Sequence, residues 1–283
     1  MSKFYNRPYF YIPAALVLLV IIFIAILLWP NGKTPASIHS ITGDVTVDEG
    51  NGFVAANVDQ ELSENDVIKT GPSSEAIVVL YEKVIVTVKE NSQITISQLS
   101  SKNQALTQQT GTVWTKVAKL GGKEEFSITT PTTTATVRGT IFMTRDGQMY
   151  ELLVGEGVVE AGGVMVYRLE KLVGTNGEYA KVNLTDDEKR ELANEIEKEI
   201  IVLQDLRLGA VLKNDIAMSF VRSNYGVTDA QVAQFLLDID SGKESEDTVR
   251  NNAPVDTQGL EEFYAYNKEI KDMMQLVKTL RGE

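Results

Sequence analysis

Short runs of β-branched residues with a two-residue period extend from Ile38 to Val182, and they constrain the fold more than any other feature. In Asp44–Val47 and Ile94–Ile96 an apolar residue alternates with a polar one, as in a strand with one buried face. Turn-forming dipeptides separate the runs: Asn51-Gly52, Gly71-Pro72, Gly121-Gly122, Asp146-Gly147, Gly162-Gly163 and Asn176-Gly177. Residues 38–182 are therefore predicted to form an all-β domain of many short strands.

Two local patterns refine this prediction. Asp146-Gly147 favours a two-residue type I′ turn, which needs φ > 0 at both positions, so Ile141–Thr144 and Tyr150–Val154 are predicted to form a hairpin. Gly43, Gly111 and Gly155 are each followed closely by valine at the start of a strand-like run. This weak internal repeat indicates stacked, similar β-units.

Residues 183–283 instead carry apolar stripes with helical spacing. Thr185 precedes three acidic residues and is predicted to cap the first helix. Further helices are expected at 211–224, after the cap Thr228, and at 257–280. The C-terminal domain, residues 183–283, is therefore predicted to be helical.

The stripe of the first helix comprises Leu192, Ile196, Ile200 and Leu203. Such stripes can pack on one another or on the β-domain, and a small helical bundle is the favoured interpretation. The alternative is a seam for a partner or for self-association, in which Leu206 and Val211 extend the stripe.

An uncharged run of 21 residues, Tyr9–Trp29, precedes the β-rich region. As a helix this run would be roughly 31 Å long, close to the hydrocarbon core of a bilayer. A transmembrane helix at residues 9–29 is therefore expected, with the lipid bilayer as its partner. A cleaved signal peptide, with Thr34-Pro-Ala36 as the cleavage site, is the alternative.

The orientation follows from the positive charges of Lys3 and Arg7, which precede the uncharged run. They predict a cytoplasmic tail at residues 1–8, a linker at 30–37 and an extracytoplasmic location for residues 30–283. The predicted location is the cytoplasmic (inner) membrane, crossed once.

Composition restricts the classes of partner and chemistry. The formal net charge is −12, which argues against a nucleic-acid partner because nucleic acid requires clustered basic residues. The chain has no cysteine, so it has neither disulfides nor thiolate chemistry. His39 is the single histidine, and one histidine cannot build a zinc site alone.

The sequence contains no nucleophile elbow, P-loop or dinucleotide-binding fingerprint. The acidic segment Asp238–Asp247 has Lys243 and Val249 where a calcium-binding EF-hand requires glycine and glutamate. We therefore predict a non-enzymatic protein with no catalytic residue, no cofactor and no metal ligand.

The order of motifs in residues 38–182 resembles the FecR-type domain, named for the ferric-citrate regulator of bacterial cell-surface signalling. The motifs are Gly43–Val47, Asp66–Gly71, Ser74–Leu80, Gly111–Val117, Phe126–Pro131, Val137–Thr140 with Phe142, and Gly155–Val159. The resemblance implies an extracytoplasmic β-solenoid-like or β-roll domain that acts as a protein-interaction and signal-relay module without catalytic chemistry. Sigma-regulating members carry a longer cytoplasmic segment and end in a mixed α/β domain, whereas a short tail and helices are expected here.

The residues that carry the resemblance are given a structural role, with recognition as the alternative: Trp114, Thr130, Pro131, Val137, Arg138, Gly139, Thr140 and Phe142. Pro131 suits a strand entrance or edge, because it lacks an N–H. Gly139 suits a bulge, a positive φ or a close backbone approach. Arg138 could clamp carbonyl groups or a carboxylate with its five donors, or contact a ligand.

The function expected from these features is that of a non-enzymatic, single-pass membrane protein. It would display a FecR-like interaction module outside the cytoplasmic membrane, as a scaffold or sensor with a protein partner at the cell envelope. One alternative is a signal-transducing regulator that acts through a separate membrane partner. Another is an envelope polysaccharide-binding protein or enzyme.

Overall fold

The computed structural model describes residues 35–118, 125–137, 139–175, 177–213, 218–219, 222–223, 226–247 and 258–283. The strands are β1 (Ala36–Thr42), β2 (Val45–Asp48), β3 (Phe53–Ala55), β4 (Val67–Thr70), β5 (Glu75–Leu80), β6 (Val84–Val88), β7 (Gln93–Leu99), β8 (Asn103–Val117), β9 (Glu125–Thr129), β10 (Thr134–Val137), β11 (Ile141–Asp146), β12 (Tyr150–Glu156), β13 (Val158–Ala161), β14 (Val164–Tyr167), β15 (Glu170–Thr175) and β16 (Glu178–Asn183). The helices are α2 (Asp186–Leu212), α4 (Asp229–Asp240) and α6 (Gln258–Arg281). The described chain is therefore mostly β, with three helices following the strands.

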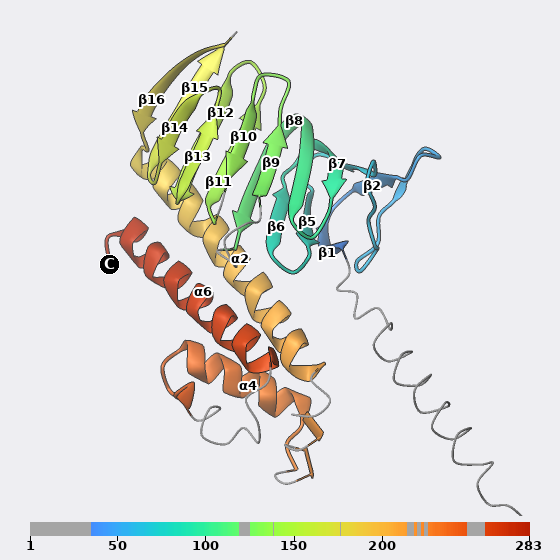
Figure 1. The fold of residues 1–283 in the computed structure, drawn as a ribbon, viewed down its shortest axis with the longest axis vertical. Coiled ribbons are helices and arrows are strands. Elements are labelled where there is room, and N and C mark those ends of the chain that lie inside the picture. The colour runs from blue at the N-terminus through green and yellow to red at the C-terminus, as the bar shows by residue number, and fades with distance from the viewer. Residues whose placement is uncertain are drawn as a thin grey trace, which may run out of the picture. The chain divides into compact units, whose positions relative to one another are not determined.

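The strands form two sheets joined by the long strand β8 (Figure 1). Sheet A has the order β1-β5-β6-β8-β11-β12-β15-β16. Sheet B has the order β3-β2-β4-β7-β8-β9-β10-β13-β14. All of these pairings are antiparallel except that of β8 with β9, which is parallel.

Strand β8 belongs to both sheets because it turns at Gly111. Residues before Gly111 pair with β7 and β9 in sheet B, and residues from Val113 to Val117 pair with β6 in sheet A. Gly111 has φ +90°, and a Cβ there would lie 2.1 Å from Ser92 Oγ and 2.5 Å from Ser92 Cα. Only glycine fits both this backbone conformation and this close approach.

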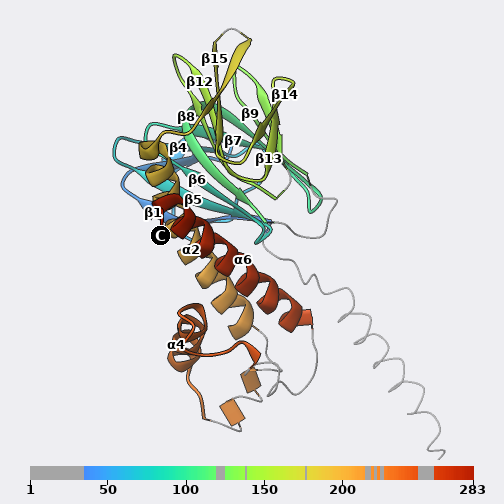
Figure 2. The ribbon, with the colours of Figure 1, turned by 90° about the vertical axis from the view of Figure 1, so that its left-hand side faces the viewer.

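The apolar side chains form two main cores. The inner faces of the two sheets enclose the first core, in which Ile94, Phe126 and Leu152 are fully buried. The second core lies between the outer face of sheet A and helices α2 and α6, and it includes Trp114 and Ile196. Figures 1 and 2 show these two helices side by side along that face of the sheet.

A third, smaller core joins α4 to the far ends of α2 and α6 and includes Phe263. Beside it, the buried Arg207 of α2 donates from Nη2 to Asp240 Oδ2 of α4 at 2.6 Å and from Nη1 to Asn267 Oδ1 of α6 at 2.6 Å. This network ties the three helices together, because a buried guanidinium needs its charge and donors satisfied.

The helices of the described residues contradict the prediction of a single-pass membrane protein. Within residues 35–283, apart from the gaps given above, no helix is long and apolar enough to cross a membrane. Each of the three helices alternates apolar residues with charged ones, as in Asp186–Leu212. The run Tyr9–Trp29 that suggested the membrane helix lies outside the described residues, as do the tail at 1–8 and most of the linker at 30–37.

The predicted helix caps are confirmed. Thr185 and Thr228 each form a capping box, with Glu188 and Gln231 respectively at the third helical position. Of the helix expected at 211–224, residues 211 and 212 belong to α2 and Lys213 is its C-cap. Residues 218–219 and 222–223 are helical, and the others lie outside the described residues. The expected helical bundle also packs on the β-domain, because α2 and α6 share their main core with sheet A.

The expected turn at Asp146-Gly147 is also wrong in its type. Strands β11 and β12 do pair as a hairpin, with Arg145 opposite Glu151. However, neither Asp146 nor Gly147 has a positive φ, and strand β12 starts only at Tyr150. The connection is therefore longer than a two-residue type I′ turn.

Candidate interaction site

The residues singled out in the sequence lie in the two cores that flank sheet A and in the two connections at either end of β10. Trp114 is fully buried on the face that α2 and α6 cover. Phe142 is fully buried between the sheets, with its ring centroid 6.3 Å from that of Phe126. Val137, at the end of β10, is buried in the same inner core.

Thr130 and Pro131 form the connection between β9 and β10. Thr130 Oγ1 accepts hydrogen bonds from the backbone N–H groups of Thr132 at 3.2 Å and Thr133 at 3.1 Å. Thr132 Oγ1 in turn reaches Asp146 Oδ2 at 3.3 Å. The Thr130 hydroxyl thus satisfies two backbone N–H groups within the turn that contains the exposed Pro131.

Gly139 and Thr140 carry the chain from β10 in sheet B to β11 in sheet A. Gly139 has φ +61°, and the buried Thr140 accepts a hydrogen bond at its carbonyl from the N–H of Val117 at 2.8 Å. A Cβ on Gly157 would lie 2.9 Å from the carbonyl oxygen of Gly139, so two glycine backbones meet here. Arg138 lies outside the described residues, so its clamp or ligand role stays a prediction.

A ladder of charges fixes α2 across sheet A. On successive turns, Glu188 pairs with Lys171 of β15 and Glu191 Oε1 lies 3.5 Å from Arg145 Nη2 of β11. Further along, Glu195 Oε1 lies 2.9 Å from Nζ of Lys89, the residue that follows β6, and Lys198 Nζ lies 3.0 Å from Glu75 Oε2 of β5. These ion pairs lie beside the apolar core and fix which strands of sheet A each turn of α2 crosses. The pairs are Glu188–Lys171, Glu191–Arg145, Glu195–Lys89 and Lys198–Glu75.

The ladder shifts the acidity of its members. Burial lowers the pKa of Lys89, but hydrogen bonds from its ammonium to Glu75 and Glu195 outweigh burial and raise that pKa well above its usual value. Burial raises the pKa of Glu75, but hydrogen bonds from Lys89 and Lys198 outweigh it and lower that pKa. Both groups are therefore charged at neutral pH and hold the helix by ionic contacts.

The helix also approaches the sheet closely at Gly155 of β12. A Cβ on Gly155 would lie 2.7 Å from Leu192 Cδ1 of α2. This glycine, part of the last motif of the resemblance, leaves room for the start of the helix to sit on the sheet.

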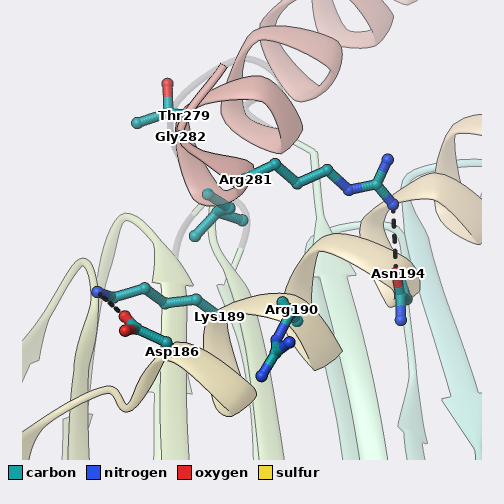
Figure 3. A pocket seen from close by; sticks show the side chains of 8 residues that line it. Asp186, Lys189, Arg190, Asn194, Thr279, Arg281 and Gly282 are labelled. Carbon is teal, nitrogen blue, oxygen red and sulfur yellow. Dashed lines mark hydrogen bonds and ion pairs between the residues drawn. The ribbon is translucent and has the colours of Figure 1, made fainter.

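A groove lies between the first turns of α2 and the last turn of α6 (Figure 3). Its cationic side chains are already paired: Lys189 Nζ donates to Asp186 Oδ1 at 3.0 Å, and Arg281 Nη2 donates to Asn194 Oδ1 at 3.2 Å. Arg281 Nη2 also donates to Glu197 Oε2 at 2.7 Å. The contacts of Arg281 therefore join α6 to α2 across the groove, and these charged side chains are already paired with protein groups.

The outer face of sheet B carries short uncharged polar side chains. Strand pairing places Thr95 opposite Thr107, Thr107 beside Thr129, and Thr129 opposite Thr134. A second row places Ser127 opposite Thr136, and Thr136 opposite the exposed Glu160. These side chains are half-buried or exposed, and the larger Phe53 and Tyr167, on strands at opposite edges of the sheet, are 47% and 50% exposed.

No three His, Cys, Asp or Glu side chains in the described part of the chain are grouped closely enough to hold a metal ion.

The charge ladder of α2 was not predicted, although the spacing of its residues in the sequence indicates it. Glu188, Glu191, Glu195 and Lys198 recur every three or four residues beside the apolar stripe. Such spacing indicates a second, polar stripe along one edge of the buried face.

The geometry can be compared with known proteins. The FecR protein family model matches residues 66–160, which span β4 to β13. The chain thus contains a FecR domain, which confirms the resemblance inferred from the motif order. A comparison with curated proteins found no match.

Two crystal structures of a candidate anti-sigma factor from Parabacteroides distasonis ATCC 8503, at 2.50 and 1.65 Å resolution, are similar to this chain. Each is 18% identical in sequence with a TM-score of 0.38, and each alignment covers 41% of this chain and 59% of the other. The chain therefore spans 59% of the length of these solved structures.

Proposed function

We propose that this chain is a non-enzymatic signalling regulator whose FecR domain binds a protein partner. The observation that carries the proposal is the FecR match at residues 66–160, since these residues supply the central strands of both sheets, including β8. The match ends before α2, α4 and α6, so the proposal rests on the strands and not on the helices.

The partner surface that fits this proposal is the outer face of sheet B. The outer face of sheet A is already covered, since Trp114 and its neighbours lie beneath α2 and α6. On sheet B, the row formed by Thr95, Thr107, Thr129 and Thr134 is uncharged in a chain with a net charge of −12. Interfaces between proteins are depleted of charge at their centre, which suits such a face.

A pairwise two-hybrid assay tests the proposal. The full chain is paired with each sigma factor and sigma-regulating protein encoded by the same genome, and binding to at least one of them is expected. The variant Thr107→Arg/Thr129→Arg is expected to abolish that signal, whereas Thr175→Arg, the same change at an exposed position of sheet A, is expected to retain it. Binding to none of these proteins, or equal loss in both variants, would contradict the proposal.

A second function, polysaccharide binding, is favoured by one specific observation. The hydroxyl rows of sheet B lie between two exposed aromatic rings, Phe53 and Tyr167. Hydroxyl groups and aromatic faces are the side chains that a neutral sugar chain can hydrogen-bond to and stack on. Thermal-shift measurements with neutral oligosaccharides would show stabilisation that Phe53→Ala and Tyr167→Ala remove; no shift with any of them would exclude this function.

A further inference from the structure

Glu199 of α2 is a buried carboxyl group with no hydrogen-bond partner. Its side chain is 2% exposed, and neither Oε1 nor Oε2 accepts a hydrogen bond. An ionised carboxylate in such a place would be costly, because it loses hydration without gaining donors. The structure therefore favours the neutral, protonated acid at this position.

The charged groups around Glu199 do not remove this preference. On the sheet side, the ammonium of Lys116 in β8 pairs with Glu269 of α6, so its charge is already balanced. On the same helix, Glu195 pairs with Lys89 and Lys198, and its negative charge repels a charge on Glu199. The groups of β8, α2 and α6 named here thus leave the Glu199 carboxyl without a cation of its own.

Glu199 also lies where α2 and α6 meet the β-domain. Its neighbours on the helix, Ile196, Ile200 and Leu203, are part of the core shared with sheet A. A charge at this point would be buried for as long as the helices cover the sheet, and would be hydrated if they separated from it.

We propose that Glu199 is a proton-binding site that makes the closure of the α2–α6 pair over sheet A depend on pH. With a proton bound, the helices cover the apolar face that contains Trp114 and Met143. Loss of the proton favours separation of the helices from that face. The inference is independent of the proposed partner, since it concerns contacts within this chain alone.

The pH range follows from the direction of the shift. Burial raises the pKa of Glu199 from 4.5 to about 8, an effect that the nearby Lys116 opposes and Glu195 adds to. The closed state thus keeps the proton at pH values where an opened, hydrated Glu199 has lost it. The stabilisation of the closed state by the bound proton is fully present below pH 4.5 and is lost as the pH rises towards 8. Within this range the equilibrium constant for closing falls close to tenfold per pH unit.

Amide hydrogen exchange of the full chain between pH 5 and 9, corrected for intrinsic rates, tests the proposal. Protection of amides in α2 and α6 is expected to fall by close to tenfold per pH unit up to pH 8 and to level off above it. Amides of β9 and β10 in sheet B are expected to show no such fall. Glu199→Gln, which is neutral at every pH, is expected to abolish the fall.

Glu197→Gln is the matched control, since it makes the same change at a 45% exposed position of the same helix, outside the charge ladder to sheet A. It is expected to keep the wild-type dependence on pH. The proposal is overturned if Glu199→Gln shows the same fall as wild type, or if sheet B loses protection in parallel with the helices. If Glu199→Gln does not fold, the carboxyl of wild-type Glu199 can be titrated by ¹³C NMR, and a pKa near 4.5 would equally overturn it.

Discussion

Replacing Gly111 by alanine tests how one strand serves both sheets of the FecR domain. Gly111 has φ +90°, and a Cβ there would lie 2.1 Å from Ser92 Oγ. The Oγ could rotate away, but Ser92 Cα, at 2.5 Å, is backbone and cannot move without displacing its strand connection. Ser92 is also fixed, because its Oγ accepts from the N–H of Thr112 at 2.9 Å and its own N–H donates to Thr70 Oγ1 at 3.0 Å.

The magnitude follows from two costs. Holding a non-glycine residue at this positive φ costs about 1–3 kcal/mol. Forcing a methyl group into the contact with Ser92 costs about 1–3 kcal/mol more, as for other overpacked sites. Gly111→Ala is therefore expected to lower the free energy of unfolding by roughly 2–6 kcal/mol, a large part of the stability of a typical domain.

Urea unfolding followed by circular dichroism measures this change. The control is Gly147→Ala, because Gly147 has no positive φ and no atom lies within 4 Å of a Cβ built there. The control is expected to stay within about 0.5 kcal/mol of wild type. If Gly111→Ala matched the control, the argument that β8 must turn at a glycine to join the sheets would be refuted.

Three further substitutions probe the helices and their contacts. Trp114→Ala should cost about 3–5 kcal/mol in urea unfolding, because it empties the centre of the helix-covered face; a cost below 1 kcal/mol would contradict that packing. Thr185→Ala should cost about 1 kcal/mol by removing the capping box of α2, and an unchanged melting temperature would contradict it. Asp240→Ala should cost about 3–5 kcal/mol in the same unfolding assay, because it leaves the buried charge of Arg207 without its carboxylate. A free energy of unfolding equal to that of wild type would contradict a stabilising role for the Arg207–Asp240 pair.

The strands were predictable because their information is local. Val45 and Val47 are buried while Thr46 between them is half-buried, and this alternation is visible in the sequence. The caps Thr185 and Thr228 were predictable for the same reason, since a capping box involves residues only three positions apart. The motif order from Gly43 to Val159 carried enough information to indicate the FecR domain.

Other features depend on contacts between residues far apart in the chain, so local sequence patterns could not predict them. The stripe of α2 is apolar whether it faces another helix or a sheet, so the sequence did not reveal that Ile196 packs beneath sheet A. Nothing in the sequence marks Glu199 as buried without a donor, because the surrounding groups come from β8 and α6. The membrane prediction failed because it depended on the single run Tyr9–Trp29, whereas the described helices all carry charges.

The claim that the chain is a signalling regulator is tested most directly by the transcript profile of a strain that lacks its gene. The account predicts that deletion changes a small, defined group of transcripts. Complementation with the wild-type gene should restore that group, whereas Thr107→Arg/Thr129→Arg, made in a chain that still folds, should not. An unchanged profile, or full restoration by that variant, would contradict the account.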